Sequence, residues 1–263
     1  MSTPLTAGNT RVKEARKLSR RPVRSERRLF LADGPKAVEG ALSTVLDSGE
    51  SCVVEVFATP AAEQRYAALL AAADVVTTVD DRALASLSDA VHPAGVVAVC
   101  RHLDVPLASA LTGPTVAICA DVRDPGNAGT VIRTADAAGA GGVVLAGSSV
   151  DAYNPKTVRA SVGSLFHLPV AVEPDPAAAV AAARAAGYTV LAADGAGEVD
   201  LFTADLGGPT AWLFGNEAWG LPADLAALAD HRVAIPIHGR AESLNLATAA
   251  AVCLYASARA QRG

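Results

Sequence analysis

Three polar turns in the second half of the chain combine residue types that can hold a ligand and take part in chemistry. Each turn follows a short apolar pattern typical of a strand and precedes a helical pattern. Strand ends in α/β proteins expose backbone groups to ligands, so each turn is a candidate ligand site. The turns are DVRDPGN, which ends at Asn127; GNEAWGLP, which contains Gly215, Asn216 and Glu217; and HGRAESLN, which contains Ser243 and Asn245.

Arg133 lies six residues after Asn127, inside a run of small and apolar residues. A long cation in that setting indicates either a functional contact or an ordinary ion pair with Asp136, three residues later. Asn127 itself suits the N-cap of the helical pattern that follows. On the residues alone, both the functional and the structural interpretations of this turn stay open.

The other two turns also have structural alternatives. Glu217 would favour the N-terminus of a following helix. Ser243 or Asn245 would cap the last helix, whose apolar stripe begins at Leu244 after the predicted strand Val233–Ile237. The glycines of the second turn allow a ligand to approach the backbone closely, but neither the GxGxxG nor the GxxxxGK[ST] phosphate-binding spacing occurs.

The elements that must position these turns alternate between strand and helix patterns. Over residues 115–263 this alternation predicts an α/β domain with a mostly parallel sheet and helices on both faces. Residues 29–100 show a smaller set of α/β patterns and predict a separate unit. Residues 101–114 contain two prolines and a glycine and are predicted to be the linker.

The composition limits the class of protein. With 51% apolar and 19% charged residues over 263 positions, an ordinary globular core is expected. No apolar run reaches the roughly 18 residues of a membrane span, and the N-terminus is not of signal-peptide type, so we expect a cytoplasmic protein without a membrane partner. The widely separated Cys52, Cys100, Cys119 and Cys253 predict neither a metal site nor a disulfide framework.

The charge is distributed unevenly along the chain. Residues 1–28 carry nine basic and two acidic side chains, a net charge of +7, which leaves −12 for the remainder of a chain whose net charge is −5. A basic arm on an acidic body is typical of a protein whose N-terminus binds RNA phosphates, and a solvated tail is the alternative. The candidate RNA-binding residues are Arg11, Lys13, Arg16, Lys17, Arg20 and Arg21.

Five segments together resemble a known family. NAGTVIRTADAAG, LFGNEAWGLP and IPIHGRAESLNLATAAAVCLYA, in this order, are similar to the three motifs of the SpoU (TrmH) family of RNA ribose 2′-O-methyltransferases in the SPOUT class. NPKTVRASVGSLFHLPV is similar to the segment between the first two motifs, and RLFLADGPKAVEGAL resembles the L30e-like substrate-binding domain of many members. The resemblance implies a deep trefoil knot in the C-terminal domain and a homodimer joined through the knot region.

The resemblance also implies roles for individual residues. S-adenosylmethionine would lie against the second and third turns, and the matching cofactor positions are Leu213, Gly215, Asn216, Ile235, Pro236 and Leu244. Arg133 would activate the ribose 2′-hydroxyl, and the other polar motif positions are Asn127, Glu217, Ser243 and Asn245. Leu254, Tyr255 and Ala258 on the last helix are either part of the dimer interface or an ordinary core face.

The resemblance leaves the RNA target and two rival functions open. The separate N-terminal domain favours ribosomal RNA over tRNA as the substrate. A catalytically silent RNA-binding protein of the same fold is an alternative, although Arg133, Ser243 and Asn245 are all present. A dinucleotide-dependent enzyme of Rossmann type is a further alternative, and its fingerprint is missing.

Overall fold

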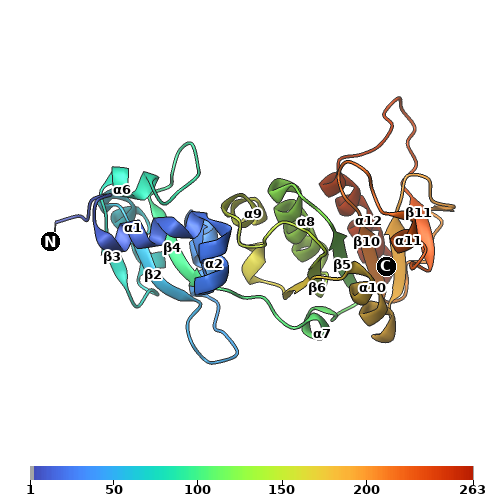
Figure 1. Ribbon diagram of the computed structural model, residues 1–263, viewed down its shortest axis with the longest axis horizontal. Helices are drawn as coiled ribbons and strands as arrows, with labels where there is room; N and C mark the ends of the chain where they lie inside the picture. The colour runs from blue at the N-terminus through green and yellow to red at the C-terminus, as the bar shows by residue number, and fades with distance from the viewer. Residues whose placement is uncertain (1–2, 263) are drawn as a thin grey trace. The chain divides into compact units, whose positions relative to one another are not determined.

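The chain divides into two compact units. The computed structural model describes residues 3–262, so Met1, Ser2 and Gly263 of the first and last predicted segments lie outside the described residues. Unit 1 comprises Met1–Leu103 and Tyr153–His167, and unit 2 comprises Asp104–Ala152 and Leu168–Gly263. Figure 1 shows both units with their helices and strands. The predicted α/β class is confirmed, but the boundaries differ from the predicted segments in three places.

Unit 1 is built on a four-stranded sheet in the order β1-β4-β2-β3. β4 is antiparallel to β1 and β2, and β2 is parallel to β3. The strands are β1 (Leu29–Asp33), β2 (Val53–Ala58), β3 (Val76–Thr78) and β4 (Val96–Arg101). The helices between them are α3 (Pro35–Leu42), α4 (Pro60–Arg65), α5 (Ala67–Leu70) and α6 (Asp81–Ala85). Thr59 and Asp80 cap α4 and α6 by accepting backbone N–H bonds.

Residues 3–28 of the basic segment are folded onto this unit and are not a separate arm. They form α1 (Thr10–Arg16), the 3₁₀ helix η1 (Lys17–Ser19) and α2 (Arg21–Arg27). Val12, Ala15 and Leu18 recur every third residue between the cations and are buried in the core of the unit. Arg24, only 2% exposed, donates to the carbonyl oxygens of Leu18 (2.9 Å) and Ser19 (2.8 Å). The apolar spacing therefore overrides the interpretation as a charged tail.

A segment from the middle of the predicted C-terminal domain also belongs to unit 1. It contains α9 (Pro155–Ser161) and the 3₁₀ helix η2 (Ser164–Phe166). Tyr153 and Phe166 pack on Phe30, with ring centroids 4.6 and 6.0 Å away. A Cβ on Gly40 of α3 would lie 2.9 Å from the Phe166 ring, so this close packing requires the glycine. Residues 115–263 are thus not one continuous unit.

Unit 2 contains a seven-stranded sheet in which every pairing is parallel, in the order β7-β6-β5-β10-β8-β11-β9. The strands are β5 (Thr115–Ala120), β6 (Gly142–Ala146), β7 (Val170–Glu173), β8 (Thr189–Ala193), β9 (Val199–Asp200), β10 (Thr210–Phe214) and β11 (His231–Ala234). All residues of β5, β6 and β10 are buried, as expected for a parallel sheet covered on both faces.

Helices cover both faces of this sheet. α7 (Leu107–Ala110), α10 (Pro176–Ala185) and α11 (Ala223–Ala226) contribute to a core with Val116, Ile118 and Leu213. α8 (Pro125–Ala138) and α12 (Leu246–Arg262) pack together and also contact β5. On the α12 side, the buried Trp212 donates from Nε1 to Ser257 Oγ at 2.9 Å. Side chains of alternate residues in β5 and β10 therefore pack against helices on opposite faces of the sheet.

The predicted linker is mostly part of unit 2. Val105 forms an isolated parallel β-bridge with Ala171 of β7. Ala110 and Leu111 are buried in the core of the unit. Tyr188 donates its hydroxyl to the carbonyl oxygen of Gly113 at 2.8 Å. Apolar side chains between the two prolines hold residues 104–114 against the sheet, so they are not a free connection.

The last strand and helix begin and end elsewhere than predicted. β11 ends at Ala234, so Ile235–Ile237 leave the sheet, because Pro236 has no N–H for the ladder. α12 begins at Leu246, and Asn245 Oδ1 caps it by accepting the N–H of Ala247 at 2.9 Å. Between them the chain projects as a long loop (Figure 1). Within residues 3–262, no helix is both long and apolar enough to cross a bilayer.

Candidate active site

The three predicted turns meet at one edge of the unit 2 sheet. They follow the carboxyl ends of β5, β10 and β11. In a parallel sheet these ends lie on the same edge, where ligands of α/β proteins bind. The order of the strands explains the meeting, because β10 lies next to β5 and only β8 separates it from β11.

A chain of side-chain hydrogen bonds joins the three turns. Asn245 Nδ2 donates to Asn127 Oδ1 at 3.1 Å, and Asn127 Nδ2 donates to Glu217 Oε1 at 3.2 Å. Glu217 also accepts the backbone N–H groups of Arg123 at Oε2 (3.0 Å) and Asp124 at Oε1 (2.9 Å). One residue of each turn therefore takes part, and Glu217 is the residue with the most partners.

These bonds favour the ionised form of Glu217. Partial burial acts to raise its pKa, but the backbone bonds from Arg123 and Asp124, together with the bond from Asn127, outweigh burial. The pKa of Glu217 is therefore lowered below its ordinary value of 4.5. At neutral pH the site contains a carboxylate that is fixed in place by donors and is not poised to take up a proton.

Asn127 is not the N-cap of α8. The helix begins at Pro125, and Asp124 Oδ1 caps it by accepting the N–H of Asn127 at 2.9 Å. An aspartate before a proline is a strong helix start, because the proline occupies the first helical position without losing a hydrogen bond. The Asn127 side chain is consequently available to join the second and third turns.

The second turn is held rigidly. Asn216 and Gly220 exchange two backbone hydrogen bonds of 2.9 Å, and the buried Asn216 amide donates to the Asp121 carbonyl at 2.7 Å. A Cβ on Gly215 would lie 2.3 Å from the carbonyl carbon of Gly220. Gly215 is therefore required by the close approach of the loop to itself, and Asn216 ties that loop to the first turn.

A cavity of about 290 Å³ opens between the second and third turns and the end of β8. Its walls are largely apolar, and its charged residues are acidic: Asp194, Glu217 and Glu242. None of its lining residues is Lys, Arg or His. The lining residues are Ala193, Asp194, Gly195, Phe214, Gly215, Asn216, Glu217, Ala218, Gly220, Val233, Ile235, Ile237, Glu242, Ser243, Leu244, Leu246 and Ala249. This composition disfavours a phosphate and fits a ligand with a cationic centre, such as the sulfonium of S-adenosylmethionine.

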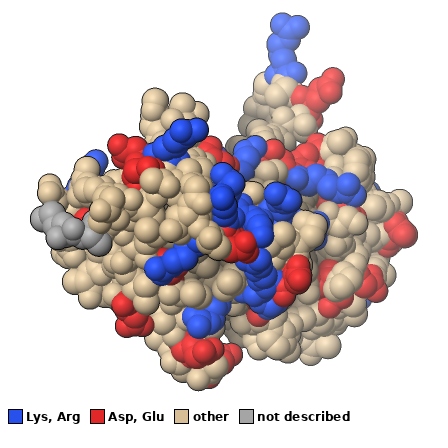
Figure 2. Space-filling model, turned by 60° about the vertical axis from the view of Figure 1, so that its left-hand side comes forward, with Lys and Arg blue, Asp and Glu red and all other residues tan. Residues whose placement is uncertain are grey.

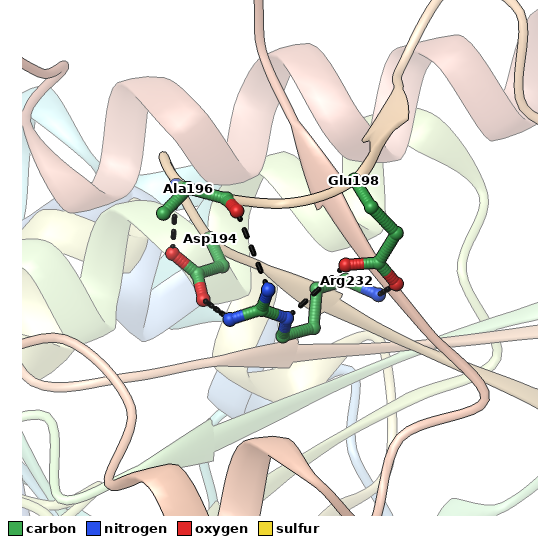
Figure 3. Close-up of polar contacts among 4 residues, drawn as sticks. All are labelled: Asp194, Ala196, Glu198 and Arg232. Carbon is green, nitrogen blue, oxygen red and sulfur yellow. Dashed lines mark hydrogen bonds and ion pairs between the residues drawn. The ribbon is translucent and has the colours of Figure 1, made fainter.

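Arg232 holds the β8 wall of the cavity. Its guanidinium lies between Asp194 Oδ2 (3.4 Å) and Glu198 Oε2 (3.1 Å), and its backbone N–H donates to Glu198 Oε1 (Figure 3). Asp194 Oδ1 in turn accepts the N–H of Ala196 at 2.9 Å. A Cβ on Gly197 would lie 2.6 Å from the Arg232 carbonyl oxygen, so the loop backbone packs directly on β11.

Four of the six predicted cofactor residues line the cavity, namely Gly215, Asn216, Ile235 and Leu244. Leu213 is fully buried in the core on the α10 face of the sheet and is not among the residues that line this cavity, so its contact with the cofactor stays a prediction. Pro236 is not among the lining residues although both its neighbours are.

The predicted polar residues divide between the cavity and a neighbouring hollow. Ser243 lines the cavity, Asn127 and Asn245 line the hollow, and Glu217 lines both. The shallow hollow, of about 690 Å³, is lined by Arg123, Asp124, Asn127, Asn216, Glu217, Ala218, Trp219 and Asn245. Arg133 is exposed on α8 and lines neither. Asp194 and Gly195 also line the cavity but were not predicted as site residues, although an Asp-Gly pair after a strand pattern is itself a turn signal.

Comparisons with known proteins agree with this geometry. The SpoU rRNA Methylase family matches residues 114–255, and the MRM3-like substrate binding domain matches residues 9–98. The 23S rRNA (guanosine(2553)-2'-O)-methyltransferase RlmP of Bacillus subtilis is 34% identical over 95% of this chain and 96% of its own length. The 23S rRNA (uridine(2479)-2'-O)-methyltransferase of Streptomyces viridochromogenes is 46% identical, but the match spans 51% of this chain and about half, 49%, of that relative.

Solved structures cover both units. The AdoMet-bound rRNA methyltransferase of Sinorhizobium meliloti has a TM-score of 0.83 at 35% identity, over 98% of this chain and 97% of that one. The SpoU methyltransferase AviRb of Streptomyces viridochromogenes, in complex with AdoMet, has a TM-score of 0.81 at 32% identity, over 95% and 98%. With its three motif turns gathered at one edge of a parallel sheet, the chain belongs to the SpoU rRNA methylase family.

Proposed function

We propose that this chain transfers a methyl group from S-adenosylmethionine to a ribose 2′-hydroxyl of ribosomal RNA. The observation that carries the proposal is the meeting of the three motif turns at an acidic cavity whose lining lacks basic residues. The rRNA methyltransferases to which the chain is similar, two of them bound to AdoMet, support the same reaction.

The cavity residues are proposed to hold the cofactor. When bound, S-adenosylmethionine supplies a methyl group on a positively charged sulfur that a nucleophile can attack. Gly215, Asn216, Ile235 and Leu244 would contact it directly, while the three carboxylates complement its charge. Leu213 and Pro236, which are not among the lining residues, are kept as cofactor positions on the family resemblance alone.

The polar chain is proposed to position the ribose. Glu217 fixes Asn127, and Asn127 fixes Asn245, so the two amides are held at the mouth of the hollow beside the cavity. Ser243 lies at the cavity itself. Positioning of the hydroxyl and the methyl group accounts for much of the rate in such a transfer.

Arg133 is proposed to bind the 2′-hydroxyl or the adjacent phosphate. A guanidinium has a pKa above about 12 and is a poor base in water, so its role would be to polarise and orient the RNA. Because Arg133 lines neither hollow of its own chain, the site is proposed to be completed in a homodimer, by Arg133 of a second copy. Tyr255 on α12 is 53% exposed and would be part of that interface, whereas Leu254 is fully buried in the core.

The first helices of unit 1 are proposed to bind the RNA backbone. Lys13, Arg16, Lys17 and Arg20 line one hollow of about 320 Å³. Figure 2 shows Lys and Arg side chains gathered in a band on the face that it draws. Of the predicted RNA contacts, Arg11 is paired with Glu55 (2.7 Å) and Lys17 with Glu14 (2.5 Å), while Lys13, Arg16, Arg20 and Arg21 are exposed. Replacing Lys13 or Arg16 should remove about one phosphate contact. The slope of log affinity against log salt concentration should therefore become shallower by about one in each variant.

Three further properties are proposed from the family. The C-terminal sheet would contain the trefoil knot, and unit 1 would be of L30e-like type, in agreement with its match to a substrate-binding domain. An enzyme that modifies ribosomal RNA would act in the cytoplasm.

The decisive experiment uses the purified protein, radiolabelled S-adenosylmethionine and ribosomal RNA from cells that lack the gene. The expected result is incorporation of label, followed by mapping of one new 2′-O-methylated nucleotide. Label in tRNA but not in rRNA would select the alternative substrate. Failure to bind S-adenosylmethionine in a calorimetric titration would favour a catalytically silent RNA-binding protein.

A further inference from the structure

Trp219 is an exposed aromatic residue on a rigid loop. Its side chain is 59% exposed, whereas the chain's other tryptophan, Trp212, is fully buried. The loop is closed by the paired backbones of Asn216 and Gly220 and by the bond from the Ala218 N–H to Asn216 Oδ1 at 2.8 Å. The fold therefore presents a large aromatic ring to solvent on a loop whose backbone is fixed, where the ring is accessible to a partner.

The surroundings of Trp219 indicate the chemistry of that partner. Trp219 is the one aromatic residue lining the hollow that also contains Asn127, Glu217 and Asn245, and it is absent from the lining of the cofactor cavity. Arg123, at the same hollow, is exposed. An aromatic face beside amides and a cation matches an unstacked nucleotide, whose base stacks on the ring and whose phosphate meets the cation.

We propose that Trp219 is the stacking platform for the base of the RNA nucleotide that receives the methyl group, with Arg123 binding its phosphate. This inference rests on the proposed function and deepens it. Because the methyl group is transferred to the ribose, the base takes no part in the reaction and is available for binding by the protein. Stacking would hold the nucleotide so that its sugar faces the Glu217–Asn127–Asn245 chain. Since stacking tolerates every base, Trp219 would supply affinity and orientation, while sequence choice lies with other contacts.

The test compares Trp219→Ala and Trp219→Phe with Phe202→Ala. Phe202 is a matched control, because it is an exposed aromatic residue (66%) of the same unit that lines neither hollow. For Trp219→Ala we expect the KM for RNA to rise by about 5- to 100-fold. Trp219→Phe should recover most of that loss, and Phe202→Ala should behave as the unchanged protein. The dissociation constant for S-adenosylmethionine should stay within twofold in all three variants.

Intrinsic fluorescence supplies a readout that does not need catalysis. A substrate RNA fragment should quench the emission of the exposed Trp219, and the quenching should vanish in Trp219→Phe, where only the buried Trp212 remains. An unchanged KM for RNA and unchanged quenching in the variants would overturn the proposal. A weaker affinity of the Trp219 variants for S-adenosylmethionine would also overturn it, because the ring would then contact the cofactor. A loss of dimer mass by light scattering would assign it to a second copy of the chain. Absence of methyl transfer by the unchanged protein would instead defeat the proposed function, and quenching would still report on the stacking.

Discussion

Replacing Glu217 by glutamine tests whether the hydrogen-bonded carboxylate organises the site. Both oxygens of Glu217 face donors, since Oε2 accepts from the Arg123 N–H and Oε1 accepts from the Asp124 N–H and Asn127. A glutamine has one oxygen and one NH₂ group. In either orientation of the amide, an NH₂ group faces a backbone N–H, so no rotation restores all the bonds.

The size of the effect follows from this geometry. A hydrogen bond to a charged group contributes about 1.5–3 kcal/mol. Because the Glu217 side chain is partly exposed, water replaces some of the lost hydrogen bonding. We therefore expect the interaction between the first and second turns to be weakened by about 1–2 kcal/mol. This corresponds to a fall of roughly 5- to 30-fold in kcat/KM for methyl transfer. A lower Tm should accompany it.

The assay compares Glu217→Gln with Glu173→Gln. Glu173 also accepts a backbone N–H, that of Asp175 at 3.0 Å, but its amide can turn its single oxygen toward that donor. Both kcat/KM and Tm of Glu173→Gln should therefore stay close to those of the unchanged protein. Equal values for the two variants would refute the reasoning that the donor set around Glu217 positions the site.

The same variant carries a prediction about pH. The folded-state pKa of Glu217 is lowered below 4.5, so the ionised group stabilises the fold at higher pH, and this contribution is lost as the pH falls from about 4.5 through the lower folded-state value. The difference in Tm between the unchanged protein and Glu217→Gln should therefore shrink in that acid range. A difference that stays constant down to pH 3 would contradict the pKa direction.

Three further substitutions test other parts of the structure. Arg232→Met should raise the dissociation constant for S-adenosylmethionine severalfold, because it loosens the loop that lines the cavity. Arg184→Met breaks another surface ion pair of unit 2 and should leave that constant unchanged. Equal dissociation constants for the two variants would contradict a role of Arg232 at the cavity. Gly215→Ala should abolish cofactor binding, because its Cβ would lie 2.3 Å from the backbone of the same loop. Gly208→Ala is the control, since its Cβ meets nothing within 4 Å. Unchanged binding of S-adenosylmethionine to Gly215→Ala in calorimetry would show that the loop can open. Arg24→Met should cost about 1–3 kcal/mol by leaving buried carbonyl oxygens without their donor, which a denaturant titration would measure, with unchanged affinity for S-adenosylmethionine.

Local patterns were sufficient to predict most of the strands and the three turns, although β1 and β9 were not predicted. The runs at 115–120 and 210–214 are continuously apolar because their strands are buried on both faces, and this signal needs no knowledge of the partner strands. The polar turns were identifiable because they interrupt such runs. Gly215, Asn216, Glu217 and Ser243, singled out in these turns, all line the cavity, and their roles stay predictions.

Several assignments depended on neighbours that the sequence does not reveal. The basic charge of residues 1–28 concealed the buried stripe of Val12, Ala15 and Leu18, which is stable only because a sheet receives it. The segment around Tyr153 joins unit 1 because Phe30 offers an aromatic surface more than a hundred residues away. Leu213 lies in a strand that ends at the site, but its side chain points to the core.

The sequence by itself determined the periodicity, the turn chemistry and the three motifs, because each is a property of neighbouring residues. The tertiary structure alone decided which turns meet. The order β5-β10-β8-β11 places the ends of distant strands at one edge, and only there do Asn127, Glu217 and Asn245 come within hydrogen-bond distance. It also decided that Arg133 lies outside the cavity of its own chain, since the face of a helix that meets a ligand is set by packing and not by spacing.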